Sequence, residues 1–134
     1  MPHLVILYTA NLDRETDMSV LCRTLADTML AVRDEAGKQV FPTGGVRVLA
    51  YPAAHSAVAD GKGDYGFVYL NLRMTAGRSA AVKQQMGDAL TAATGAHFVD
   101  LLARNPLGIT LQIDEGAEVY NGKHSSLHPL FNKA

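Results

Sequence analysis

The residue with the most distinctive chemistry in this chain is Pro2, which follows the initiator Met1 and opens the apolar run of residues 2–8. Removal of Met1 ahead of a small residue would leave the proline nitrogen as a secondary amine. The reference pKa of an α-amine is about 7.7–8.0, and burial or nearby cations lower it toward neutrality. Such an amine is an effective general base, so Pro2 is a candidate catalytic residue. The alternative is a proline tolerated at a strand start, where no backbone N–H is needed.

Two arginines stand beside glycines at the starts of predicted elements. Arg47 follows Gly44-Gly45-Val46 at the start of a strand, and Arg78 follows Gly77 at the start of a helix. Backbone N–H groups at a helix N-terminus favour anions, whereas an arginine there opposes the helix macrodipole. Because a guanidinium can bind a carboxylate through two hydrogen bonds, both residues are candidate carboxylate-binding groups. The alternative is that both are ordinary surface arginines.

Other motifs are better explained without a cofactor or a metal. Residues 61–66 have the spacing of a dinucleotide fingerprint, but they precede a predicted strand, whereas that fingerprint follows a strand and opens a helix. His124 and His128 are four residues apart in a serine-containing tail that offers no evident third ligand. We therefore expect neither a cofactor nor a bound metal.

Composition excludes several classes of function. The 134 residues fit a single domain over residues 1–134, and 48% of them are hydrophobic, as in ordinary globular proteins. A net charge of −1 gives no electrostatic reason to expect a nucleic-acid partner or an anionic membrane. Cys22 is the single cysteine, and its place in a helical apolar pattern predicts a buried thiol. The sequence has no apolar run long enough to cross a membrane, and its N-terminal run does not resemble a signal peptide, so we expect a cytoplasmic protein.

The elements that must position these residues form two similar units. In the first, apolar residues on both faces predict a strand over residues 2–9. Helical spacing from Met18 to Val32 predicts a helix that ends near Gly37, and residues 46–51 form the second strand.

The second unit repeats this order. Residues 64–74 and 107–113 are predicted strands, and between them a long amphipathic helix runs from its N-cap Ser79 to about Asn105. Two strand–helix–strand units imply an α+β fold in which a mixed or parallel four-stranded sheet carries both helices on one face.

Two helices cover only one face of such a sheet. The other face must be buried in another way, and self-association is the simplest solution. The C-terminal arm, over about residues 115–134, resembles a segment that packs on a neighbour. It carries the apolar residues Val119, Tyr120, Leu127, Leu130 and Phe131.

Several motifs together resemble the 5-carboxymethyl-2-hydroxymuconate Δ-isomerases of the tautomerase superfamily, which also includes 4-oxalocrotonate tautomerase and macrophage migration inhibitory factor. The resemblance covers nearly the whole chain. Its motifs are Met1-Pro2-His3, Gly45-Val46-Arg47, Ala59-Asp60-Gly61, Asp64-Tyr65-Gly66-Phe67-Val68, Ala76-Gly77-Arg78-Ser79, Gln84-Gln85 and Leu127-His128-Pro129-Leu130-Phe131.

The resemblance implies a tautomerase-like homotrimer, in which the two β-α-β units of each chain form a four-stranded mixed sheet facing a central channel. It implies that Pro2 is the catalytic base and that Arg47 and Arg78 bind the substrate. If Met1 is retained, the Pro2 nitrogen is an amide and cannot act as a base. Residues 32–40 form a segment longer than is usual in the family, so substrate preference is open to change.

The function implied is a cofactor-independent isomerase that converts 5-carboxymethyl-2-hydroxymuconate, a small-molecule carboxylate, to its conjugated keto isomer in homoprotocatechuate (aromatic) catabolism. One alternative is a tautomerase of another enol acid, such as a phenylpyruvate-like compound. Another is a non-catalytic trimer that binds ligands, because a fold does not determine a function.

Overall fold

The computed structural model describes residues 2–131 of the chain. Met1, whose removal the sequence predicts, and residues 132–134 of the predicted arm lie outside the described residues. The elements, in chain order, are β1 (His3–Thr9), η1 (Ala10–Arg14), α1 (Met18–Leu30), η2 (Thr43–Gly45), β2 (Arg47–Ala53), β3 (Gly66–Thr75), α2 (Ala80–His97), α3 (Val99–Arg104), β4 (Leu107–Gly116) and α4 (His128–Phe131).

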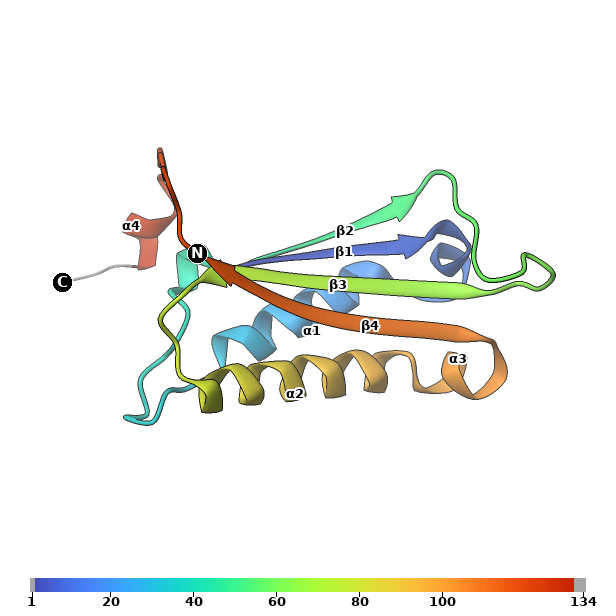
Figure 1. The fold of residues 1–134 in the computed structure, drawn as a ribbon, viewed down its shortest axis with the longest axis horizontal. Helices are drawn as coiled ribbons and strands as arrows, with labels where there is room; N and C mark the ends of the chain where they lie inside the picture. The colour runs from blue at the N-terminus through green and yellow to red at the C-terminus, as the bar shows by residue number, and fades with distance from the viewer. Residues whose placement is uncertain (1, 132–134) are drawn as a thin grey trace.

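The four strands form one sheet in the order β2-β1-β3-β4 (Figure 1). β1 runs parallel to β2 and β3 runs parallel to β4, whereas the central pair, β1 and β3, is antiparallel. In the chain, α1 connects the first parallel pair and α2 connects the second. This topology confirms the predicted mixed sheet made of two β-α-β units.

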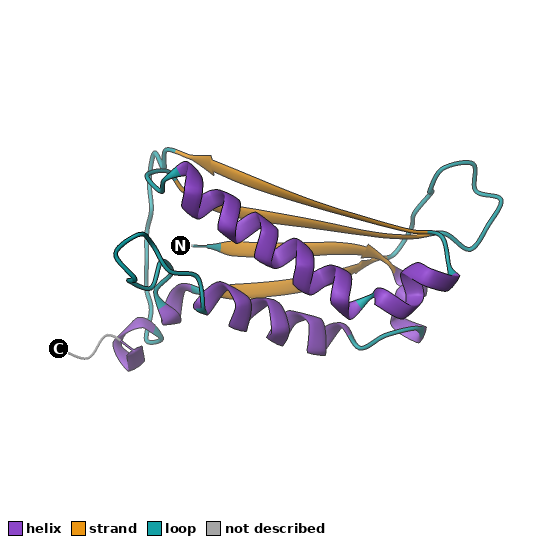
Figure 2. Ribbon diagram, turned by 90° about the horizontal axis from the view of Figure 1, so that it is seen from below, coloured by secondary structure: helices purple, strands orange, loops and turns teal. Residues whose placement is uncertain are grey.

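Both long helices pack on the same face of the sheet (Figure 2). Alternation along β1 turns Leu4, Ile6 and Tyr8 toward the helices, and these side chains are 0–5% exposed. The core between sheet and helices also contains Leu21, Leu25, Met29, Val68, Leu70, Leu72, Met86 and Leu90. None of the helices in the described part of the chain is long and apolar enough to cross a membrane.

The opposite face of the sheet is apolar and uncovered in the single chain. Leu7, Leu49 and Tyr51 are 47–49% exposed there, and Phe67 is 36% exposed. Leu7 pairs with Tyr51 on one side, which places their side chains together on this face. We name Leu7, Leu49, Tyr51 and Phe67 the open face.

The first helix ends earlier than its apolar spacing predicts. α1 stops at Leu30, not near Gly37. The Asp34 carboxylate accepts hydrogen bonds from the backbone N–H groups of Ala36 and Lys38, at 2.9 Å each, and Gly37 has a φ of +79°. An aspartate side chain that binds backbone in this way favours a turn over helix, and glycine adopts a positive φ readily.

The second helix is divided where the sequence predicts one continuous helix to Asn105. α2 ends at His97, and the short α3 follows after Phe98, whose φ of −100° and ψ of 15° depart from helical values. The Phe98 side chain is 1% exposed. This ring belongs to the buried core at the break between the two helices, a position that periodicity alone does not reveal.

The C-terminal arm packs partly on its own chain, and contact with a neighbouring subunit stays a prediction. β4 ends at the end of the sheet where β1 begins, and the arm stays at this end, where α4 contacts η2 (Figure 1). Val119 and Tyr120, in contrast, are 102% and 88% exposed. The glycines of η2 leave the space in which α4 sits.

Cys22 is half-buried, whereas the sequence predicts a buried thiol. It lies on the flank of α1 near Val48 of β2, and no further helix within residues 2–131 covers this edge of the sheet. Burial is nevertheless sufficient to raise the pKa of the Cys22 thiol. The exposed flank explains why helical spacing alone misplaces this residue.

Candidate active site

Pro2 is buried immediately before β1. Its neighbour His3 pairs with Arg47 of the parallel strand β2 and with Arg73 of the antiparallel strand β3. Pro2 therefore lies where β1 and β2 begin and β3 ends. A residue in this position is flanked by the loop into β2 and by the loop out of β3, which are the segments that carry the two predicted arginines.

Arg78 is held firmly in the loop after β3. Its Nη1 donates hydrogen bonds to the backbone oxygen of Thr75, at 3.1 Å, and to Thr75 Oγ1, at 3.0 Å. Its guanidinium carbon lies 5.2 Å from the centre of the Phe41 ring, which is within the range of a cation–π contact. These contacts fix the direction of the guanidinium before any ligand binds.

The helix that follows Arg78 begins with a regular cap. The Ser79 hydroxyl accepts a hydrogen bond from the backbone N–H of Val82, and it also donates to the Glu35 carboxylate of the loop after α1. Gly77 precedes Arg78 with a φ of +122°, a conformation that favours glycine. The Gly-Arg-Ser sequence thus turns the chain sharply, supports the arginine and starts α2.

Arg47 begins β2 and is half-buried. Its Nη1 donates to the backbone oxygen of Gly45 at 3.3 Å. Val48 and Ala50 pack against the helix-covered core, so strand alternation directs Arg47 to the other side of the sheet, together with Leu49. The backbone of Arg47 therefore lies near Pro2 at the same end of the sheet, whereas its side chain points to the open face.

His3 shares this row of the sheet with Arg47. Burial and the positive charge of Arg47 lower the pKa of the His3 imidazole below its usual value of 6.5. His3 is consequently a neutral side chain at neutral pH. Tyr8, the other pocket candidate near Pro2 in sequence, is at the far end of β1, where it donates a 2.6 Å hydrogen bond to Asp13.

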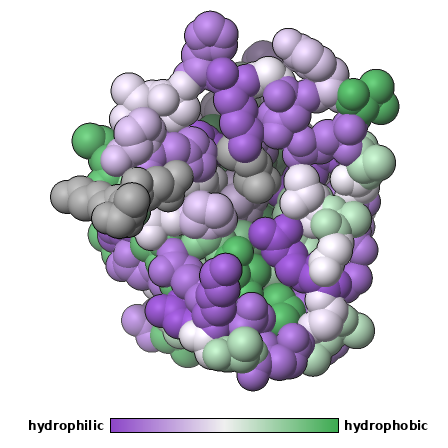
Figure 3. All heavy atoms as spheres, turned by 90° about the vertical axis from the view of Figure 1, so that its left-hand side faces the viewer, coloured by the Kyte–Doolittle hydropathy of each residue, from purple (hydrophilic) through white to green (hydrophobic). Residues whose placement is uncertain are grey.

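The structure thus brings Pro2, Arg47 and Arg78 to one end of the sheet, with Arg47 directed away from the helix side. Figure 3 faces this end and shows a mainly hydrophilic surface with smaller hydrophobic areas. Two further residues at this end were not predicted as site residues: Phe41, beneath Arg78, and His128, near Pro2. No chemical signal in the sequence singles out Phe41, and His128 drew attention as a possible metal ligand and as part of a family motif.

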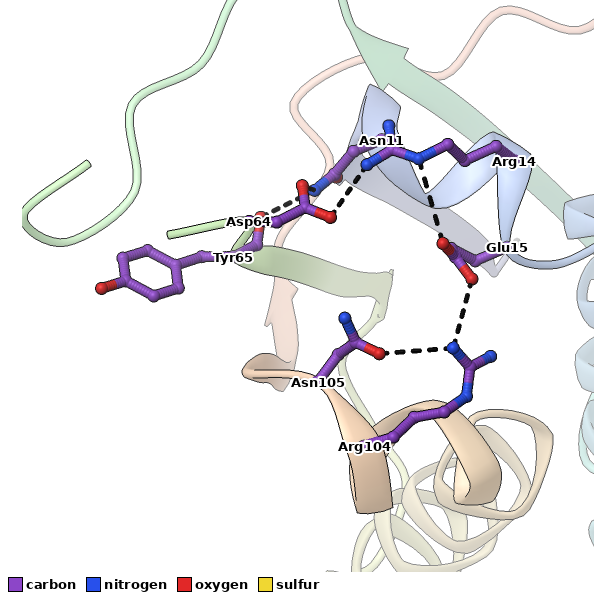
Figure 4. Close-up of polar contacts among 7 residues, drawn as sticks. All are labelled: Asn11, Arg14, Glu15, Asp64, Tyr65, Arg104 and Asn105. Atoms are coloured by element: carbon purple, nitrogen blue, oxygen red, sulfur yellow. Dashed lines mark hydrogen bonds and ion pairs between the residues drawn. The ribbon is translucent and has the colours of Figure 1, made fainter. Parts of the chain in front are cut away.

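The opposite end of the molecule carries a structural polar network (Figure 4). Asn11 Nδ2 donates to Asp64 Oδ1 at 3.0 Å and to the Tyr65 backbone oxygen at 2.9 Å, and Arg14 forms a 2.8 Å ion pair with Asp64. These contacts tie the long loop between β2 and β3 to η1. Their carboxylates and cations are already paired with one another, so the network serves to anchor the loop.

A hollow of about 740 Å³ lies at this far end, beside the N-terminus of α1. Its rim carries the acidic side chains Asp13, Glu15 and Asp17, and its arginine, Arg14, is already paired with Asp64. Such a rim repels carboxylates, so this hollow is a poor candidate for the predicted ligand. Among the described residues, no group of three or more His, Cys, Asp or Glu side chains is arranged to hold a metal ion.

Comparisons with known proteins point to one family. The sequence profile of 5-carboxymethyl-2-hydroxymuconate isomerase matches residues 2–131. A 5-carboxymethyl-2-hydroxymuconate Δ-isomerase of Escherichia coli is 30% identical over 131 residues, which cover 98% of this chain and 99% of that protein.

Solved structures agree with this relationship. A crystal structure of a 5-carboxymethyl-2-hydroxymuconate Δ-isomerase has 57% identity and a TM-score of 0.95, covering 100% of this chain and 95% of the other. A 5-carboxymethyl-2-hydroxymuconate isomerase from Deinococcus radiodurans R1 has 35% identity and a TM-score of 0.86, covering 98% and 95%. A fused 4-OT symmetric trimer, at 20% identity and a TM-score of 0.52, shares the fold.

Proposed function

Because this chain belongs to the 5-carboxymethyl-2-hydroxymuconate isomerase family of the tautomerase superfamily, and is therefore an isomerase, we propose that it converts 5-carboxymethyl-2-hydroxymuconate into its conjugated keto isomer. The reaction needs no cofactor, because one proton leaves an oxygen and one proton is added to a carbon. The observation that carries the proposal is the position of Arg78, fixed by Thr75 and Phe41 at the same end of the sheet as Pro2.

Pro2 is the general base of this reaction once Met1 has been removed. Its neutral nitrogen takes the proton of the 2-hydroxyl group, and the electron pair of the O–H bond forms the ketone. The double bonds shift along the chain, and the proton is returned to a carbon at the other end of the conjugated system. Burial of Pro2 and the nearby cations favour the neutral amine, since both disfavour the ammonium ion.

Arg78 and Arg47 bind the substrate carboxylates and stabilise the negative charge that develops as the hydroxyl proton leaves. Arg78 suits this role because its hydrogen bonds to Thr75 and its contact with Phe41 fix its orientation in advance. Preorganised donors avoid the cost of reorientation during the reaction. Only Nη1 of Arg78 donates to Thr75, so the other N–H groups of the Arg78 guanidinium can form a bidentate contact with a carboxylate.

A homotrimer completes the site. The open face needs cover, and Arg47 emerges on that same side of the sheet. When open faces meet around a three-fold axis, Arg47 of one subunit can reach the Pro2 pocket of the next. The trimer thus buries apolar surface and joins the two arginines in one pocket, and the working enzyme acts in the cytoplasm on an intermediate of homoprotocatechuate breakdown.

A second candidate substrate is another enol acid, such as a phenylpyruvate-like compound. The observation that favours it is the long loop between α1 and β2, which supplies Phe41 beneath Arg78 and Glu35 beside Ser79. Because this loop contacts the Arg78 guanidinium through Phe41, a change in the loop can alter which substrate carboxylate Arg78 binds. Parallel assays with the muconate and with the enol of phenylpyruvate distinguish the two substrates.

The decisive experiment pairs intact-mass measurement with an isomerase assay on the same preparation. We expect a mass without Met1 and a change in ultraviolet absorbance as the conjugated ketone forms. Full activity in a preparation whose mass retains Met1 would refute Pro2 as the base. A Met1-free preparation that isomerises neither substrate would overturn the proposed activity and favour a non-catalytic ligand-binding trimer.

A further inference from the structure

Within the described part of the chain, two buried side-chain polar atoms have no hydrogen-bond partner: Asn11 Oδ1 and His128 Nε2. Asn11 belongs to the anchoring network at the far end, where its amide nitrogen is already used (Figure 4). His128 lies at the Pro2 end. Because an unpaired buried polar atom is costly, its presence near a candidate active site points to a ligand.

Close packing of α4 against η2 fixes the position of His128. A Cβ atom added to Gly44 would lie 3.1 Å from His128 Cα and 3.2 Å from Phe131 Cδ2, so the backbone of α4 approaches where only a glycine leaves room. The Ser125 hydroxyl accepts hydrogen bonds from the backbone N–H groups of Leu127 and His128, at 3.1 and 3.4 Å, and thereby starts α4. The glycine and the serine together fix the position of the imidazole.

His128 and Pro2 both approach Gly45, the second glycine of η2. A Cβ atom on Gly45 would lie 3.5 Å from His128 Cε1 and 3.8 Å from Pro2 Cδ, so both rings are within 4 Å of one point above Gly45. Cε1 is bonded to Nε2 in histidine, and Cδ is bonded to the nitrogen in proline. The imidazole that carries the unpartnered nitrogen therefore shares the space above Gly45 with the Pro2 ring.

We propose that His128 is a substrate-binding residue: its Nε2–H donates a hydrogen bond to a substrate carboxylate held beside Pro2, and α4 forms a wall of the pocket. This inference rests on the proposed function and deepens it, because it assigns recognition of one carboxylate to the C-terminal arm. A metal is a poorer partner, since His124 is exposed and the described residues offer no cluster of ligands. A substrate carboxylate, in contrast, needs only the single N–H donor that His128 supplies from the C-terminal arm.

The test replaces the imidazole of His128 by side chains that keep either an aromatic ring or an N–H donor. His128→Phe keeps an aromatic ring over Gly45 but has no donor, and we expect kcat/KM to fall about 10- to 100-fold, the range for a hydrogen bond to a charged group. His128→Gln keeps an N–H donor at similar reach and should recover part of the loss. His124→Phe is the matched control, because His124 is an exposed histidine of the same arm. α4 contributes no buried residue, so the core should fold in all three variants.

Binding of muconate by calorimetry provides a second measurement. Muconate has two carboxylates but no enol hydroxyl, so it binds without reacting, and His128→Phe should weaken it by a similar factor. Equal kcat/KM and equal muconate affinity in wild type and His128→Phe would overturn the inference, as would equal losses in His128→Phe and His128→Gln. If the wild-type protein binds muconate through His128 yet isomerises nothing, the proposed activity fails and this inference stands.

Discussion

The guanidinium of Arg78 lies over the Phe41 ring, 5.2 Å from its centre. Phe41 is fully buried and comes from the loop after α1, whereas Arg78 stands between β3 and α2. The two β-α-β units therefore meet beneath the proposed site. This contact gives the long loop of the first unit a direct influence on a ligand-binding residue of the second.

Replacing the ring beneath Arg78 should impair catalysis more than its effect on stability explains. For Phe41→Leu we expect kcat/KM to fall about 3- to 30-fold, because a desolvated cation–π contact contributes about 0.5–2 kcal/mol. Phe98→Leu is the matched control: it removes an equally buried ring, 1% exposed, that contacts His97 instead. Urea unfolding should show similar destabilisation in both variants. Equal kcat/KM in both would argue against support of Arg78 by Phe41.

The pH dependence of catalysis should report the Pro2 amine. We expect kcat/KM to rise with pH through one ionisation below the reference α-amine value of about 7.7–8.0, because only the neutral amine accepts the proton. Pro2→Ala keeps a primary amine after processing, so it should retain reduced activity with a shifted profile. A profile that is flat between pH 5 and 9 would exclude the amine as the base.

Arg78 should be sensitive to both charge and shape. We expect Arg78→Ala to lower kcat/KM about 100-fold, the scale of losing one preorganised donor to developing charge. A change in KM alone would indicate equal binding of ground and transition states, whereas a fall in kcat would indicate action on developing charge. Arg78→Lys keeps the charge but loses the planar fork, so it should recover only part of the activity. Arg23→Ala, in an exposed ion pair with Asp27, is the control and should match wild type.

The protein should be a trimer in solution. Light scattering should give three times the 14.3 kDa mass of the chain. Leu49→Lys places a charge on the open face and should shift the population toward monomer, because burying an unpaired charge is costly. Val20→Lys alters a residue of similar exposure, 53% against 48%, on α1 away from that face, and should leave the trimer intact. A stable wild-type monomer at micromolar concentration would contradict the assembly.

Stability should fall in mild acid because of His97. Its Nε2 lies 2.7 Å from Thr16 Oγ1, and burial lowers the pKa of the imidazole in the folded state. The unfolded chain then binds more protons, so the free energy of unfolding is highest above the ordinary histidine value of about 6.5 and decreases as pH falls below it. Urea unfolding at pH 7.5 and 5.5 should show a smaller loss for His97→Gln than for wild type or for His55→Gln, which changes an exposed histidine. An unchanged loss in His97→Gln would rule out this origin.

Much of the fold could be predicted from local pattern. Apolar residues on alternating positions distinguish β1, and helical spacing distinguishes α1 and α2, because each side chain reports the burial of its own side of the element. The uncovered face of the sheet could also be predicted, because two helices cover only one face of a four-stranded sheet. Errors occurred where a local interaction overrides periodicity, as with the Asp34 turn that ends α1 before Gly37.

The sequence by itself determined the residue types of the candidate site: a proline behind the initiator Met and two arginines beside glycines, in the order of a recognisable family. Only the tertiary structure decided that Phe41 supports Arg78, that Arg47 points to the open face of the sheet, and that His128 meets Pro2 above Gly45. Periodicity relates a residue to neighbours within a few positions. Contacts between the two ends of the chain depend instead on how strands pair and where a glycine leaves space, and neither is written in local spacing.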